Sequence, residues 1–128
     1  MSSYTRVLLA LAALLMAVAV SLGAIGSHAL RSALPHERLA IWHTAVEYHF
    51  YHALGLFAVG LISRHLPESK LIQWSGWLLA VGVLLFSGSL YAYALSGEKW
   101  LTSLTPAGGI ALIAGWLLLA ATLARPLN

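Results

Sequence analysis

Residues 71–96, LIQWSGWLLAVGVLLFSGSLYAYALS, contain no charged side chain. As an α-helix this segment is about 39 Å long, which exceeds the ~30 Å hydrocarbon core of a bilayer. Three other segments are similarly apolar, so we predict an all-α fold, an integral membrane bundle of four transmembrane helices in a single domain over residues 1–128. The predicted spans are residues 5–27, 39–63, 71–96 and 102–124.

The composition of the whole chain supports this fold class. Hydrophobic residues make up 60% of the 128 residues and charged residues 9%, and the mean hydropathy is +0.84. A soluble domain of this size could not cover so apolar a surface with so few charges. The N-terminal segment has some features of a signal peptide, but its uncharged run over residues 7–25 is longer than a usual signal-peptide core. We interpret it as a retained transmembrane helix.

The basic residues are dispersed along the chain, which argues against binding to nucleic acid. The sequence contains no cysteine, which excludes disulfides and thiolate chemistry. With four spans, both termini lie on the same side of the membrane as the second connection. That side carries four basic residues and the other side three, so the positive-inside rule predicts cytoplasmic termini. The four are Arg6, Arg64, Lys70 and Arg125, and the three are Arg31, Arg38 and Lys99.

Polar and aromatic residues gather in one half of the predicted bundle, chiefly in WHTAVEYHFYHAL at residues 42–54. At 100° per residue, His43, Glu47 and Tyr51 form one stripe, whereas His49 and His52 face other directions. The second helix must therefore be surrounded on several sides, by its own bundle or by another protomer. The candidate polar-cluster or ligand residues are His28, His43, Glu47, Tyr48, His49, Tyr51, His52, Ser87, Ser89, Tyr91 and Thr105.

Several interpretations of this chemistry remain open. A charged carboxylate at the depth of Glu47 is costly unless it is paired, so one interpretation is a buried network with His43, helped by Ser89 or Tyr91, that fixes the helix register. Another is a metal site, because His43 and Glu47 are spaced to point at one ion. Others are proton or ion handling, or a bound lipid, quinone or haem. The candidate metal ligands are His28, His43, Glu47, His49 and His52.

No catalytic residue is predicted. A serine, a histidine and Glu47 could be combined as a hydrolase triad, but the sequence has no nucleophile elbow and no oxyanion loop. The sequence requires no cofactor, and the identity of any metal or haem stays open. Small residues at four-residue spacing instead predict close helix packing, within the bundle or between copies of the chain. The predicted packing residues are Gly23, Gly26, Gly88, Ala92, Ala107, Gly108, Gly109, Ala111 and Gly115.

Five motifs resemble a known family. They are GAIGSHAL at 23–30, WHTAVEYHFYHAL at 42–54, FSGSLY at 86–91, TPAGG at 105–109 and GW at 115–116. They are similar to the hallmarks of the small membrane-protein family catalogued as domain of unknown function 423, which includes the eukaryotic transmembrane protein 256. The resemblance implies a four-helix inner-membrane protein, bacterial or mitochondrial in type, with no settled activity. Many members have glutamine in place of His43 and Glu47, so the resemblance favours His28, Tyr48, His49 and His52 for a shared site.

We therefore expect a protein of the bacterial inner membrane without catalytic machinery. Its polar cluster would stabilise the bundle and line a site for a small ligand, a lipid or a partner. The alternative is a metal- or cofactor-binding membrane subunit, with a redox or ion-handling role, that uses the histidines of the second span together with His28. The expected partners are membrane lipids and either a second copy of the chain or a larger membrane complex.

Overall fold

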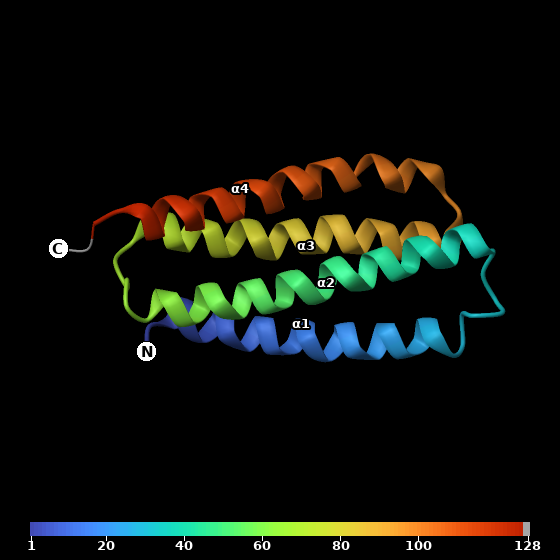
Figure 1. The fold of residues 1–128 in the computed structure, drawn as a ribbon, viewed down its shortest axis with the longest axis horizontal. Helices are drawn as coiled ribbons and strands as arrows, with labels where there is room; N and C mark the ends of the chain where they lie inside the picture. Colours follow the sequence, from blue (N-terminus) through green and yellow to red (C-terminus); the bar gives the residue numbers. More distant parts are fainter. Residues whose placement is uncertain (127–128) are drawn as a thin grey trace.

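The computed structural model describes residues 1–126, which form four long α-helices joined by short connections (Figure 1). Each long helix is apolar enough to cross a membrane, the last one together with the short 3-10 helix that precedes it. The predicted all-α fold with four membrane-length helices is confirmed. The elements are α1 (Ser3–Ser27), α2 (His36–Ser63), α3 (Lys70–Ser96), the 3-10 helix η1 (Lys99–Ser103) and α4 (Thr105–Ala124).

Each helix packs mainly on its neighbours in the sequence. α2 contacts α1 and α3, and α3 in turn contacts α4. Successive helices run in opposite directions, so both termini and the α2–α3 connection lie at one end of the bundle (Figure 1). The α1–α2 and α3–α4 connections lie at the other end, which is the end that carries most of the polar residues.

Two helix starts differ from those expected. α2 begins at His36, three residues early, because Pro35 supplies the extended residue before the helix and Glu37 suits the positive end of the helix dipole. α4 begins at Thr105, three residues late, because residues 99–103 form the 3-10 helix. No side chain caps the start of α4, and the Thr105 hydroxyl lies 2.6 Å from the Ser89 hydroxyl of α3.

The apolar core lies where α2 and α3 pack on each other and on the outer helices α1 and α4. Among the described residues its buried members come from all four helices. They are Leu8, Ala12, Leu15, Ala53, Leu56, Val59, Ile72, Leu79, Ala80, Val83, Leu112 and Leu119. In a membrane this packing, rather than a hydrophobic effect between helices, holds the bundle together.

Glycines allow α3 and α4 to approach most closely. A Cβ at Gly115 would lie 2.8 Å from the Leu79 side chain, and a Cβ at Gly82 would lie 2.8 Å from Leu112. A Cβ at Gly108 would meet the backbone of Phe86. Glycine on one helix therefore faces a large side chain or bare backbone on the other along the whole contact, which is the small-residue packing typical of membrane helices.

Candidate functional site

The candidate polar residues do not form one cluster. His49, Ser87 and Tyr91 lie together at the contact of α2 with α3. Ser89 and Thr105 form a separate pair between α3 and α4. The other candidates on α2 lie away from both groups, and His28 is exposed at the end of α1. The candidates therefore form small, separate polar contacts rather than a single site.

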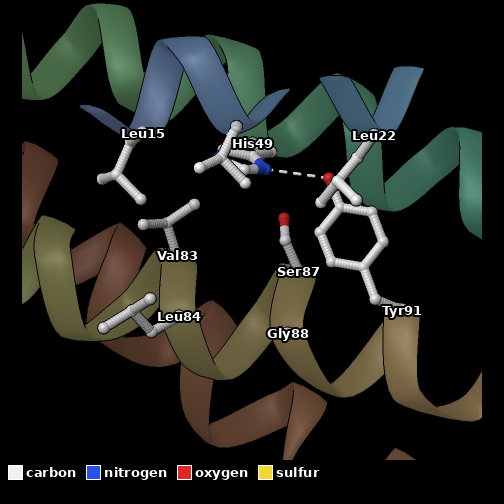
Figure 2. Close-up of a pocket in the computed structure, with 9 residues that line it drawn as sticks. Leu15, Leu22, His49, Val83, Leu84, Ser87, Gly88 and Tyr91 are labelled. Carbon is white, nitrogen blue, oxygen red and sulfur yellow. Dashed lines mark hydrogen bonds between the residues drawn. The ribbon is translucent and has the colours of Figure 1, made fainter. Parts of the chain in front are cut away.

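A cavity of about 180 Å³ lies between α1 and α3, and His49 of α2 lines it (Figure 2). Its lining is almost wholly apolar apart from His49, Ser87 and Tyr91. Gly88 marks an open part of the wall, because a Cβ added there would meet no atom within 4 Å. The lining residues are Leu15, Val18, Leu22, His49, Val83, Leu84, Ser87, Gly88 and Tyr91.

His49 is the most unusual residue of this cavity. Its side chain is 4% exposed, and Nδ1 lies 2.8 Å from the Tyr91 hydroxyl (Figure 2). Its other ring nitrogen, Nε2, is buried and is the one buried side-chain polar atom in residues 1–126 without a hydrogen bond. The Leu15 carbonyl of α1 lies near the ring, but no contact of Nε2 has hydrogen-bond geometry. An orphaned buried polar atom calls for an explanation, since leaving it unpaired costs about 1–3 kcal/mol.

The hydrogen bond to Tyr91 indicates which proton His49 carries. Within the described chain His49 Nδ1 is the one hydrogen-bond partner of the Tyr91 hydroxyl. The hydroxyl proton therefore takes part in a hydrogen bond only if Tyr91 donates to Nδ1. A neutral imidazole that accepts at Nδ1 carries its hydrogen on Nε2. We assign this tautomer from the network, and it makes the orphaned atom a hydrogen-bond donor.

Ser87 closes the cavity against α2. Its hydroxyl donates to the Ala45 carbonyl at 2.9 Å, so its hydrogen is already used. The contact ties α3 to α2 one turn before His49 and fixes the distance between the histidine and the wall of α3. Ser87 therefore shapes the cavity, and His49 is the polar lining residue that has a buried ring nitrogen without a hydrogen bond.

His52 belongs to another contact. Its ring is 7% exposed, and Nδ1 donates to the Tyr48 carbonyl at 2.7 Å. The ring stacks on the Tyr48 ring and lies 5.9 Å from that of Trp116. Trp116 covers Gly55, where an added Cβ would lie 2.7 Å from the indole. This contact joins α2 to α4 and gives Trp116 the packing partner that its position inside α4 requires.

The stripe of His43, Glu47 and Tyr51 lies on the exposed outer face of α2. The Tyr51 hydroxyl is 3.4 Å from Glu47 Oε1, which is a long hydrogen bond. The expected network with His43, Ser89 or Tyr91 does not form. Ser89 is engaged with α4 and Tyr91 with His49, because α3 packs on the other side of α2. The sequence allowed this stripe to be covered either by the chain's own bundle or by another protomer. The chain's own bundle does not cover it.

The five candidate metal ligands are also separated. In residues 1–126 no three His, Cys, Asp or Glu side chains come close enough together to hold a metal ion. His43 and Glu47 share the outer face, His49 lines the cavity, His52 lies under Trp116, and His28 lies beyond the last turn of α1.

The predicted packing residues have unequal surroundings. Gly26 fits under Trp42, Gly23 and Gly109 have ordinary contacts with Val46 and Phe86, and Gly88 faces open space. Ala92 and Ala111 are half-buried and Ala107 is exposed. Close approaches also occur at glycines of α2 and α3 that were not predicted, because these glycines lie five or six residues apart rather than four. They are Gly55, Gly60, Gly76 and Gly82.

These features define a polytopic α-helical membrane protein without an evident catalytic constellation in its described residues. A family model described as "Protein of unknown function (DUF423)" matches residues 22–109, and the chain belongs to this family. The resemblance found in the sequence is thereby confirmed. The matched region contains His49, Ser87 and Tyr91.

Bacterial relatives cover nearly the whole chain. The UPF0382 membrane protein YwdK of Bacillus subtilis (strain 168) is 41% identical over 89% of this chain and 93% of its own length. UPF0382 membrane proteins of Staphylococcus haemolyticus and Staphylococcus epidermidis are 43% and 44% identical, each over 89% of this chain and 92% of their own. No solved structure matches.

Proposed function

We propose that the protein binds a lipid-soluble carbonyl compound in the cavity between α1 and α3 and does not transform it. The observation that carries this proposal is His49 Nε2, a buried donor without a partner beside a cavity. Because Nε2 is buried behind the cavity wall, a small shift of the ring would bring it to the carbonyl oxygen of a bound molecule, which would accept its hydrogen and remove the cost of the unpaired group. The apolar walls would hold the rest of the molecule.

Size and depth both restrict the ligand. A cavity of about 150 Å³ suffices for a benzene ring, so the ~180 Å³ here suits one substituted ring or a similar group. His49 lies at the middle of α2, between His36 and Ser63. Phospholipid ester carbonyls lie near the edge of the hydrocarbon core, about 15 Å from its centre. The depth therefore favours a molecule that dissolves in the membrane interior, such as a quinone.

We further propose that the protein lies in the bacterial inner membrane with both termini in the cytoplasm. Bacterial relatives named as membrane proteins support the location. The end of the bundle that holds the termini has one basic residue more than the other, which supports the orientation through the positive-inside rule.

A titration with a short-chain benzoquinone tests the binding proposal. The protein is placed in phosphatidylcholine nanodiscs, and tryptophan fluorescence is followed, since Trp42 lies 4.7 Å from Tyr91 and thus beside the cavity. We expect saturable quenching. His49→Phe removes the donor and raises Kd by about fivefold to tenfold, the effect of one hydrogen bond. Gly88→Leu fills the open wall and abolishes saturation without disturbing a packed contact.

Ala120→Leu is the matched control, because it adds the same side chain on an exposed part of α4. It should leave Kd unchanged. Quenching that is linear and equal in all four proteins would contradict the proposal. Native mass spectrometry of the same samples separates the sources of the carbonyl, since a phospholipid retained by the wild type and lost from Gly88→Leu would identify an ester carbonyl instead.

A further inference from the structure

The outer face of α2 carries a polar group that the cavity does not use. Glu47 is exposed and lies nine residues beyond Arg38, about 14 Å along the helix axis, within the membrane-spanning helix. Among the described residues its one hydrogen bond is the long contact from Tyr51. A carboxyl group in hydrocarbon is costly without partners. Arg38 does not serve it, because its guanidinium packs beside Gly97 at the end of α3.

Exposed residues on this face recur at alternating spacings of four and three. The mean spacing is 3.5 residues, and residues at this spacing form the seam along which two helices pair in a left-handed supercoil. Any exposed helix face has this geometry, but here one carboxyl group stands in a seam of otherwise uncharged residues, and a single strongly polar residue in such a seam can set register and partner number. The seam consists of Ala40, Thr44, Glu47, Tyr51, Leu54, Ala58 and Leu61.

The hydrogen-bond donors nearest to Glu47 lie on the same face of α2. His43 and Tyr51 lie one turn to either side of it, about 6 Å along the axis. The stripe therefore presents an acceptor between two groups that donate hydrogen bonds. Ala40, Thr44 and Ala58 add short side chains, which allow two helix backbones to approach.

We propose that this seam is the contact surface between two copies of the chain, related by a two-fold axis along the membrane normal. The two α2 helices then run parallel at equal depth. The Glu47 carboxyl of each copy lies within reach of Tyr51 of the partner subunit and of His43 of the partner subunit. The contact is reciprocal, as a two-fold interface requires.

This proposal does not depend on the ligand site. Glu47 and His49 point about 160° apart around α2. The seam therefore faces away from the cavity between α1 and α3, and variants in one region leave the other intact. The fluorescence titration and the experiments below can fail separately.

Cysteine cross-linking in native membranes tests the contact surface. The sequence has no cysteine, so an introduced thiol has no partner within its own chain, and a disulfide product of twice the chain's mass joins two copies. Leu54→Cys lies in the seam, and Leu117→Cys is the control, since both leucines are well exposed, at 59% and 64%. We expect a cross-linked dimer with Leu54→Cys and little with Leu117→Cys. Equal yields, or a higher yield from α4, would overturn the proposal.

A second measurement tests the role of Glu47. Energy transfer between labelled copies in detergent gives the dimer dissociation constant. Glu47→Leu removes the carboxyl from both copies and should raise it by about sixtyfold, the effect of losing four membrane hydrogen bonds of average strength. Glu68→Leu, in the exposed connection between α2 and α3, should not change it. A monomeric wild type, or a dimer equally strong in Glu47→Leu, would refute the proposed contact.

Discussion

Gly108→Ala provides the sharpest test of how α3 and α4 pack. An ideal Cβ at Gly108 would lie 2.8 Å from Phe86 Cα and 3.0 Å from the Gly82 carbonyl, whereas ordinary contact begins at 3.4 Å. These are backbone atoms and cannot rotate away, and the Phe86 nitrogen would lie closer still, so the helices must separate by more than about 0.6 Å at this layer. Overpacking of this kind costs about 1–3 kcal/mol. The higher helix propensity of alanine returns up to about 1 kcal/mol, which leaves a net loss of up to about 2 kcal/mol.

The matched control is Gly88→Ala on α3. A Cβ there meets no atom within 4 Å, so only the propensity gain of about 0.5–1 kcal/mol remains. The free energy of unfolding is measured for both variants by titration with sodium dodecyl sulfate from mild detergent, with helix content followed by circular dichroism. We expect the two variants to shift in opposite directions. A stability for Gly108→Ala equal to or above that of Gly88→Ala would refute the close backbone contact.

Two further predictions concern buried hydrogen bonds. Tyr91→Phe leaves His49 Nδ1 without its partner and should lower the free energy of unfolding by about 1–3 kcal/mol in the same titration, whereas Tyr51→Phe on the exposed face should change it by less than about 0.5 kcal/mol. Thr5 and Ser63 are buried and their hydroxyls lie 2.6 Å apart between α1 and α2, so a double-mutant cycle of Thr5→Val and Ser63→Ala should give a coupling of about 0.6–1.7 kcal/mol; additive effects would contradict this contact.

The sequence predicted the fold well because the signal is long and simple. Each span is an apolar run long enough to cross a bilayer, and the intervening segments carry the charges and prolines. The starts of α2 and α4 were harder to place. Pro35 precedes a helix that begins with three polar residues, and residues 101–104 are uncharged and continue the run of α4, although residues 99–103 form a 3-10 helix.

The arrangement of the polar residues was less predictable. Helical periodicity separated His49 from His43 and Glu47, which is what the structure has. Periodicity could not show which neighbour each face meets. That depends on the order in which α1, α3 and α4 surround α2, which follows from contacts such as Trp116 on Gly55 and Trp42 on Gly26. The exposure of Glu47 therefore emerged only from the three-dimensional packing.

The proposed ligand site is tested most directly by nitrogen NMR of His49. The protein is labelled with ¹⁵N-histidine and compared in two kinds of nanodisc, one made from pure phosphatidylcholine and one from a bacterial membrane lipid extract. We expect Nε2 to carry the hydrogen and to shift in the bacterial extract alone, as it binds a carbonyl compound, with no such change in Gly88→Leu. Identical His49 signals in both nanodiscs, with Nε2 hydrogen-bonded to a protein carbonyl such as that of Leu15, would contradict a ligand in this cavity.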